Sequence, residues 1–274
     1  ASGHVLYDLS FLLMDLIARR LTPAANGVLN GYFAAARRVN DCEGLVALPL
    51  FMSLRAAIRA KVTAARLNQS VVSEEHDDTA RVAQRYFELA LTLIAPSAPV
   101  IVCTGGLSGT GKSVLAKALA PGIAPLPGAL VLRSDVERKT RFGVRETEHL
   151  PSQAYRPEIS DTIYQTLHDK AVRIARAGHS VIIDAVYAGV PERTAIEVAA
   201  REANVSVHGL FLKADWETRL ARIGKRGPDA SDADADVARR QEEFEIGSLF
   251  WDIVDASGSP AETLTRACEV LTAR

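Results

Sequence analysis

Gly106-Leu107-Ser108-Gly109-Thr110-Gly111-Lys112-Ser113 fits G-x-x-x-x-G-K-[ST], the pattern of a phosphate-binding P-loop. The apolar, β-branched run at residues 100–104 precedes it and predicts a buried strand, and residues 114–120 predict a helix after it. Glycines let backbone N–H groups turn toward phosphate oxygens, and the start of a helix faces the same anion. The stretch therefore predicts a strand, a loop and a helix that together bind a nucleoside triphosphate.

The motif assigns a role to each of its polar side chains. Lys112 is expected to reach the β- and γ-phosphates, and the Ser113 hydroxyl is expected to ligate Mg²⁺. The backbone from Gly106 to Val114 is expected to surround the phosphates. No Asn-Lys-x-Asp element of guanine-specific GTPases and no Ser-Gly-Gly-Gln transporter signature occurs in the chain. We therefore expect ATP and Mg²⁺ as cofactors, although the residues do not exclude GTP.

Composition narrows the class of protein. The 274 residues are 48% hydrophobic and 24% charged, with a net charge of −1. Without an overall positive charge, nucleic acid is a disfavoured but open partner. The three cysteines match no zinc spacing, and no apolar run is long enough to cross a membrane. These features, with no secretory leader visible, predict a cytoplasmic protein. The first residue is Ala rather than Met, as expected of a fragment or a processed chain.

Two prolines at residues 96 and 99 divide the chain into two predicted regions. Residues 1–95 carry apolar side chains at helical spacing, for example Phe51, Leu54, Ile58 and Val62, and predict an all-α region. Asn-Gly pairs at residues 26–27 and 30–31 are expected to interrupt these helices. Residues 98–274 are expected to form a separate P-loop kinase domain.

Strands and helices alternate in this second region. Strands are predicted at residues 129–132, 181–183, 205–212 and near 253–254, and helices at 157–177 and 191–203, from residue 216, and at the end of the chain. Alternation of this kind predicts an α/β fold, a parallel sheet with helices on both faces. Ligands of such sheets bind at the carboxyl ends of the strands.

Asp135 and Arg138 follow the second predicted strand. A carboxylate at this edge of the sheet can accept the proton of an attacking hydroxyl, so Asp135 is a candidate base. Arg138 lies one helical turn further on and could hold an anionic or hydroxylated acceptor. The alternative is that Ser134 or Asp135 only caps a helix.

Asp184 ends the apolar strand at residues 181–183, as in a Walker B strand, and is expected to face Mg²⁺. The next residue is Ala185 rather than the glutamate that a hydrolytic motor would use to orient water. This favours transfer to a bound acceptor over a motor. Capping of the following turn is the alternative role for Asp184.

A basic cluster precedes a glycine- and proline-containing loop at residues 227–232. Arg222 or Arg226 could close over the transferring phosphoryl group, although a solvated helix face is the alternative. The acidic residues of the loop lack the glycine and the terminal glutamate of a calcium loop. They are expected at the surface: Asp229, Asp232, Asp234 and Asp236.

The P-loop, residues 133–139, Asp184-Ala185-Val186, and residues 229–233 and 255–258 together resemble the P-loop kinase-like domain of bacterial AAA_33-type ATP-binding proteins. The resemblance covers about residues 98–274. Small kinases related to this group include gluconate kinase, chloramphenicol phosphotransferase, the zeta toxins and polynucleotide 5′-kinase. The resemblance implies that Asp135 is the base, that Arg138 binds the acceptor and that Arg222 or Arg226 is a lid arginine. It also places residues 255–259 near the adenine.

Residues 7–16 resemble the start of the C-terminal helical part of an aminoglycoside phosphotransferase-like domain. The catalytic loop H-x-D-x-x-x-x-N of that domain is missing, so the helical region is not expected to be an active kinase by itself.

The whole pattern predicts a kinase that transfers the γ-phosphoryl of Mg-ATP to a hydroxyl of a small molecule. A nucleotide-binding regulatory module and a polynucleotide 5′-kinase remain as alternatives.

Overall fold

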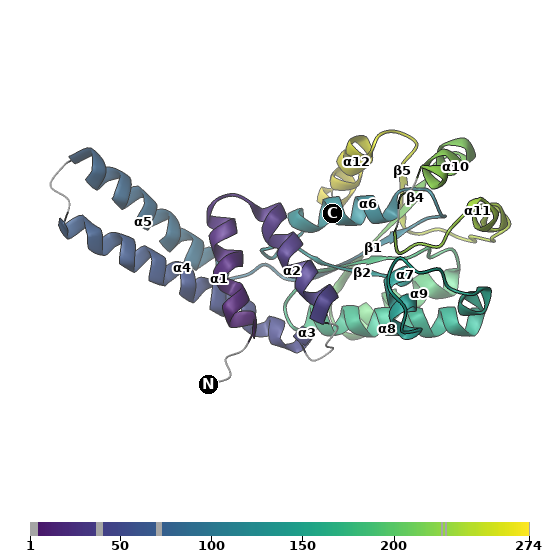
Figure 1. Cartoon of the computed structure of the whole chain (residues 1–274), viewed down its shortest axis with the longest axis horizontal. Helices are drawn as coiled ribbons and strands as arrows, with labels where there is room; N and C mark the ends of the chain where they lie inside the picture. Colours follow the sequence, from purple (N-terminus) through teal and green to yellow (C-terminus); the bar gives the residue numbers. More distant parts are fainter. Residues whose placement is uncertain (1–4, 37–40, 70–72, 226, 228, 274) are drawn as a thin grey trace. The chain divides into compact units, whose positions relative to one another are not determined.

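The structure is a computed structural model that describes residues 5–36, 41–69, 73–225, 227 and 229–273. The chain divides into two compact units. One comprises Ala1–Ala98 with Pro121–Ala129 and Ala177–His179, and the other comprises Pro99–Ala120, Leu130–Arg176 and Ser180–Arg274. In Figure 1 the chain runs from the purple helices of the first unit to the yellow end of the second.

The first unit is helical throughout residues 5–94 as far as they are described, which confirms the predicted all-α region. Helix α1 packs against α2 and α4, and α4 pairs with α5 along its length. The Ser53 hydroxyl donates to the Ala90 carbonyl over 2.8 Å and ties α4 to α5. The elements are α1 (Val5–Ala18), α2 (Thr22–Ala36), α3 (Asp41–Gly44), α4 (Leu48–Ala65) and α5 (Ser73–Ile94), with 3₁₀ turns at Leu45–Ala47 and Arg66–Gln69.

The expected breaks at the Asn-Gly pairs were wrong, because both pairs lie inside α2. The Asn26 and Asn30 side-chain amides donate to the Ala129 carbonyl at 2.9 and 3.1 Å within the same unit. These bonds give the amides partners outside the helix, so they need not compete with the helical backbone. Tertiary contacts therefore override a local turn signal.

Helix α4 is confirmed, but the apolar residues that we used to predict it do not form its buried face. Leu54, Ile58 and Val62 are 44%, 42% and 50% exposed. The residues that pack inside the unit are offset from them by two positions: Leu48, Met52, Ala56 and Ala60. Helix α4 is therefore apolar on two faces, and periodicity alone does not choose between them.

The described residues of the second unit form a five-stranded parallel sheet in the order β2-β3-β1-β4-β5. Four of the strands lie within a residue or two of the predicted ranges and the fifth includes its predicted position. They are β1 (Val100–Gly105), β2 (Leu130–Arg133), β3 (Val181–Asp184), β4 (Ser206–Lys213) and β5 (Asp252–Asp255). Their apolar side chains form the centre of the core, with Ile101, Val102, Ile182 and Ile183 fully buried.

The register of the sheet decides which residues meet at its carboxyl edge. Thr104 of β1 pairs with Asp184 of β3, and Asp184 pairs with Arg133 of β2. The P-loop follows β1 directly, so Asp184 and Arg133 lie beside the loop on neighbouring strands. Beside the P-loop, the edge where ligands of parallel sheets bind therefore carries the Asp184 carboxylate and the Arg133 guanidinium.

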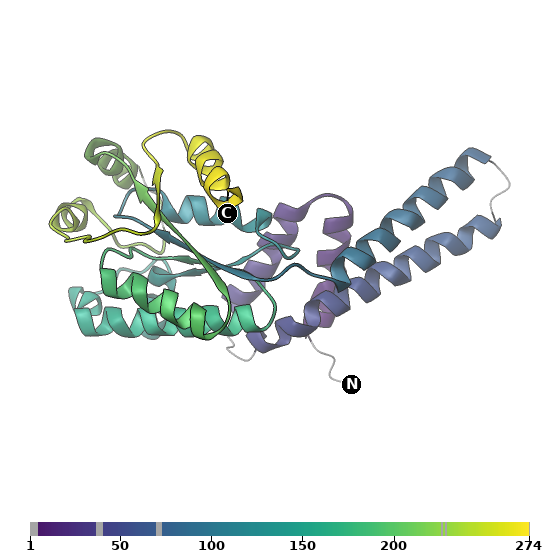
Figure 2. The ribbon, with the colours of Figure 1, turned by 180° about the vertical axis from the view of Figure 1, so that it is seen from behind.

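Helices cover both faces of the sheet, as predicted. Helices α6 and α12 pack together on one face, and α8 and α9 pack together on the other (Figures 1 and 2). The helices of this unit are α6 (Lys112–Leu119), α7 (Ser134–Arg141), α8 (Pro157–Arg176), α9 (Val190–Glu202), α10 (Trp216–Gly224), α11 (Ala235–Gln241) and α12 (Pro260–Thr272), with 3₁₀ turns at Ala120–Gly122 and Ser152–Tyr155. Within the described ranges, no helix is both long and apolar enough to span a membrane.

A buried histidine on α8 predicts a loss of stability in acid. His168 is 5% exposed, and its Nε2 lies 3.1 Å from the Tyr187 hydroxyl. Burial lowers the pKa of His168 from 6.5 to about 4, so the unfolded chain takes up the proton first as the pH falls. We expect the free energy of unfolding to decrease between these two pH values by up to about 3 kcal/mol from this group.

Urea unfolding at a series of pH values measures this effect. His168→Gln removes the titrating group and should flatten the decrease. Part of it should remain, because burial also lowers the pKa of His179 to about 4. A variant with the same pH dependence as the parent protein would show that His168 does not contribute.

Candidate active site

The P-loop has the backbone conformation that its glycines permit. Gly106, Gly109 and Gly111 have positive φ angles of 130°, 85° and 95°. A Cβ atom at Gly106 would lie 2.5 Å from the Leu212 carbonyl oxygen, and one at Gly109 would lie 2.6 Å from that of Arg219. Neither position could hold a side chain without moving the backbone. Helix α6 then begins at Lys112, directly after the loop.

Residues outside the motif hold the loop in place. The Ser108 N–H donates to Gln241 Oε1 of α11 over 2.7 Å, and Arg219 Nε of α10 donates to the Ser108 carbonyl over 2.8 Å. Arg219 is 3% exposed and also pairs with Glu242. The Lys112 Nζ donates to the Leu107 carbonyl over 3.1 Å, so its ammonium group lies along the loop. These contacts from outside the motif help to hold the loop in its shape.

A cavity of about 1180 Å³ opens above the P-loop. Most of the predicted site residues border it, but Gly106 and Leu107 do not. The predicted residues in its wall are Ser108, Gly109, Thr110, Gly111, Lys112, Ser113, Val114, Asp135, Arg138, Asp184 and Arg222. A smaller hollow of about 420 Å³ beside Trp251 contains none of them.

Asp135 lies in the first turn of α7, directly after β2. Burial raises the pKa of its carboxyl group, and the nearby Asp184 carboxylate raises it further, whereas Lys112 and Arg133 act in the opposite direction. A carboxylate with a raised pKa is a stronger base than an exposed aspartate. Helix α7 has no side-chain hydrogen bond at its N-cap, which is Arg133, so the capping alternative has no support here.

Ser113 and Asp184, the two predicted metal ligands, meet at the guanidinium of Arg133. Arg133 Nη2 lies 3.2 Å from Ser113 Oγ, and Arg133 Nε lies 3.2 Å from Asp184 Oδ2. The Arg133 guanidinium therefore contacts both Ser113 Oγ and Asp184 Oδ2. A hydroxyl and a carboxylate of this kind are oxygen ligands that suit Mg²⁺, which usually completes its shell with water and substrate phosphates. In the part of the chain that is described, no group of three or more His, Cys, Asp or Glu residues could hold a metal alone.

Arg138 forms part of the far wall of the cavity. Its Nη1 donates to the Ala154 carbonyl over 2.5 Å and its Nη2 to Ser160 Oγ over 3.3 Å. The guanidinium lies over the Tyr155 ring, 4.8 Å from its centroid. The residue is 6% exposed, and its Nε has no partner among the described residues. Arg138 is thus a buried cation with only neutral hydrogen-bond partners and one spare donor.

Arg222 contacts backbone carbonyls in this structure. Its guanidinium donates to Ala256 at 2.8 Å, to Gly258 at 2.6 Å and to Thr110 of the P-loop at 3.4 Å. It therefore joins the P-loop to the segment after β5. Arg226, the other candidate lid arginine, lies outside the described residues.

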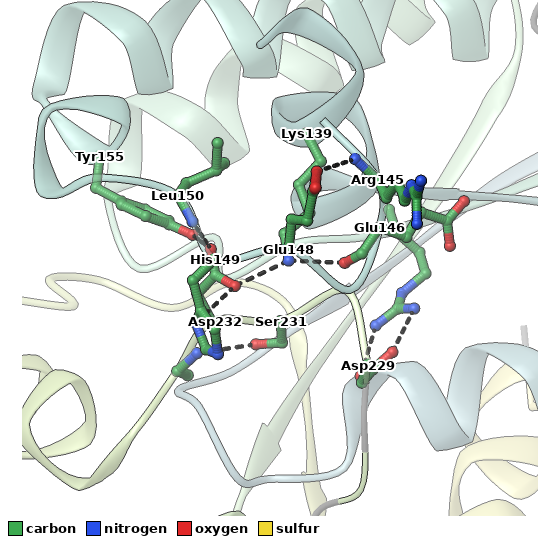
Figure 3. A network of polar contacts seen from close by, with 12 residues as sticks. Lys139, Arg145, Glu146, Glu148, His149, Leu150, Tyr155, Asp229, Ser231 and Asp232 are labelled. Carbon is green, nitrogen blue, oxygen red and sulfur yellow. Dashed lines mark hydrogen bonds and ion pairs between the residues drawn. The ribbon is translucent and has the colours of Figure 1, made fainter. Parts of the chain in front are cut away.

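The expected surface position was wrong for two of the four aspartates in the acidic segment at residues 229–236, Asp229 and Asp232. Asp229 forms a bidentate pair with Arg133 at 2.9 and 3.0 Å. Asp232 accepts hydrogen bonds from Lys139 Nζ, the Leu150 N–H and the Tyr155 hydroxyl at 2.8, 3.0 and 2.6 Å, as Figure 3 shows. Asp234, which caps α11, and Asp236 are both exposed, as expected. The loop is fixed because buried cations on β2 and α7 attract its carboxylates.

Several residues of the site were not predicted. Arg133, Asp229, Gln241 and Glu192 all shape the cavity or the groups beside it. Arg133 and Asp229 lie in two of the segments that carry the family resemblance, but that resemblance assigned neither of them a role. Gln241 and Glu192 carried no signal, and the tertiary fold alone brings them to the cavity.

This chain is similar to several known proteins. Three curated relatives, described as uncharacterized proteins of Mycobacterium bovis and of two Mycobacterium tuberculosis strains, are each 29% identical over 271 residues. The match covers 96% of this chain and 51% of each relative, so the chain spans about half their length.

Two solved structures are similar over about two thirds of the chain. A gluconokinase from Sinorhizobium meliloti 1021 has a TM-score of 0.47 and 17% identity, covering 64% of this chain and 93% of that one. The APS kinase CysC of Mycobacterium tuberculosis, in complex with AMPPNP and APS, has a TM-score of 0.48 and 19% identity, covering 65% and 99%.

Residues 100–245 match the AAA_33 family, which is described as an AAA domain. The match begins with β1 and ends after α11, so it contains the P-loop, Asp135, Asp184 and the acidic loop. It lies outside residues 1–95, whose resemblance to an aminoglycoside phosphotransferase gains no support from any of these similarities. More than half of the 274 residues lie within the match, and the chain belongs to the AAA_33 family of AAA domains.

Proposed function

We propose that this chain is an ATP-dependent kinase that transfers the γ-phosphoryl group to a hydroxyl of a small molecule. One observation carries the proposal: a single cavity joins the P-loop to Asp135 and, beyond it, to a wall of polar side chains. That wall includes Arg138, Tyr155, Tyr164 and Glu192. A nucleotide hydrolase needs room for a water molecule, whereas this site has room for a second substrate.

In the proposed reaction, the acceptor oxygen forms a bond to the γ-phosphorus while the bond to the β–γ bridging oxygen breaks and ADP leaves. The hydroxyl proton passes to the Asp135 carboxylate. Lys112 and the P-loop amides hold the phosphates and offset their growing charge. Arg138 binds the acceptor and orients its hydroxyl toward Asp135, using the Nε donor, for which the described residues provide no partner.

Ser113 and Asp184 would hold Mg²⁺, because both already lie against one cation in this structure. When bound with the nucleotide, the ion would offset charge on the β- and γ-phosphate oxygens. Residues 1–95 have no assigned part in the reaction, and their division from residues 98–274 at the prolines stays a prediction.

Incubation with γ-labelled ATP and a pooled set of hydroxyl acceptors tests the function. The pool should contain sugars, sugar acids, aminoglycosides and 5′-hydroxyl oligonucleotides, with Lys112→Ala as the control for contaminating kinases. Label on any small molecule supports the proposal, and label on the oligonucleotide instead identifies a polynucleotide 5′-kinase. ATP binding without transfer to any acceptor would favour a regulatory module.

For Arg222 we propose a role in nucleotide binding, which differs from lid closure over the phosphoryl group. Its three carbonyl contacts hold the segment at residues 256–258 against the P-loop. Arg222→Ala removes these charge-assisted hydrogen bonds, so we expect the KM for ATP to rise about tenfold with a smaller change in kcat. Steady-state kinetics with varied ATP measure both constants. A fall in kcat at constant KM would instead support the lid role predicted from the sequence.

A further inference from the structure

Arg133 has partners that are unusual for a structural ion pair. It is the last residue of β2, and the sheet register places it beside Asp184. Its guanidinium binds Asp184 Oδ2 at 3.2 Å, both carboxylate oxygens of Asp229 at 2.9 and 3.0 Å, and Ser113 Oγ at 3.2 Å. The group thus lies among oxygens from three separate elements: the start of α6, the end of β3 and the acidic loop.

These contacts lie away from bulk water. The side chains of Arg133 and Asp184 are 10% and 5% exposed, and that of Asp229 is 30% exposed. An ion pair alone would explain the two carboxylates. It would not explain why the same guanidinium takes the hydroxyl oxygen of Ser113, the P-loop residue whose side chain is expected to ligate the metal.

We propose that Arg133 is the resident cation of the metal site: its guanidinium occupies the position of the divalent ion until a nucleotide brings the metal. This inference rests on the proposed function, because it assumes a metal–nucleotide substrate. Two cations cannot share these oxygens, so a free divalent ion is excluded while Arg133 stays. The phosphates of the nucleotide add the negative charge that lets a metal take Ser113 and Asp184. The bidentate pair with Asp229 then retains the displaced guanidinium.

Manganese binding to the nucleotide-free protein tests this directly, because free Mn²⁺ is counted by its paramagnetic resonance signal. The parent protein should bind Mn²⁺ weakly. Arg133→Gln leaves Ser113, Asp184 and Asp229 facing a site without a cation. An arginine beside a carboxylate weakens proton binding to that carboxylate by about one to three powers of ten. It opposes the binding of a metal cation in the same way, so we expect a gain in Mn²⁺ affinity of at least about tenfold. Added Mn²⁺ should also raise the melting temperature of this variant, but not that of the parent.

Three further variants separate charge from shape. Arg133→Lys keeps the positive charge and should bind Mn²⁺ as weakly as the parent. Arg141→Gln removes another arginine of the same unit, which is exposed at the end of α7, so it is the matched control and should gain nothing. The double variant Arg133→Gln with Asp184→Asn should lose most of the gain, because it removes the carboxylate that the metal would bind. A second measurement needs no variant: with inorganic triphosphate present, the parent should remove more free Mn²⁺ from solution than the same triphosphate does alone.

The proposal is overturned if folded Arg133→Gln binds Mn²⁺ no more tightly than the parent, or if Arg133→Lys gains as much as Arg133→Gln. Tight Mn²⁺ binding by the parent without triphosphate would overturn it as well, even if Arg133→Gln failed to fold. None of these measurements uses an acceptor. Their failure would leave phosphoryl transfer untouched, and absence of transfer to every acceptor would leave the Mn²⁺ result unaffected.

Discussion

Asp135→Asn should reduce phosphoryl transfer by at least about a hundredfold while ATP binds with near-parental affinity. The substitution keeps the size of the side chain and removes most of its basicity. General-base assistance is worth on the order of a hundredfold to ten-thousandfold in rate. Because burial and Asp184 raise the pKa of Asp135, its carboxylate is better matched to accepting a proton than an exposed aspartate. The loss should therefore appear in the chemical step.

The measurement is kcat at saturating acceptor, together with ATP affinity from calorimetry and the melting temperature. Glu137→Gln is the matched control, since Glu137 lies on the same helix but pairs with Lys170 at 2.6 Å. We expect near-parental transfer in that variant. Equal transfer rates in Asp135→Asn and the parent would remove Asp135 from the reaction and leave another group to accept the proton.

The sequence predicted the elements of the P-loop unit closely because their signals are local. The apolar β-branched run of β1 predicts a buried strand, and the glycines after it predict a loop. Pro157 at the first position of α8 and Gly178 after its end mark the bounds of that helix. The P-loop motif also predicts phosphate binding, because backbone amides supply most of the phosphate contacts in such loops.

The order of the strands could not be predicted in this way. Alternating strands and helices predict a parallel sheet, but not that β3 lies between β1 and β2. That order brings Arg133 against Asp184 and thereby places a guanidinium at the expected metal site. The acidic loop is a similar case: Asp229 and Asp232 look like surface residues until their partners Arg133 and Lys139, more than ninety residues earlier, are in place. Long-range electrostatic pairing leaves no periodic signal in the sequence.

Lys112→Ala should weaken ATP binding and reduce turnover by about a hundredfold to a thousandfold, the usual loss when one charge-stabilising group is removed from a reacting centre. The fold should persist. Lys112 is the first residue of α6, where alanine is a good helix former, and the loop is shaped by glycines and by Gln241 and Arg219. Its hydrogen bond to the Leu107 carbonyl leaves the ammonium group beside the cradle that the phosphates would occupy.

Titration with a fluorescent ATP analogue and transfer assays at varied ATP measure the two effects, with melting temperatures as the check on folding. Lys61→Ala removes the same charge from an exposed position on α4 of the helical unit, and should change neither ATP affinity nor turnover.

Lys112→Arg separates the effect of the charge from that of the side chain's shape. The arginine keeps the charge, but its planar fork replaces a compact ammonium group. Partial recovery of ATP affinity without recovery of turnover would mean that any positive charge at this position attracts the phosphates. Catalysis would then need the geometry of lysine. Parental affinity and turnover in Lys112→Ala would instead refute the assignment of residues 106–113 as the nucleotide site.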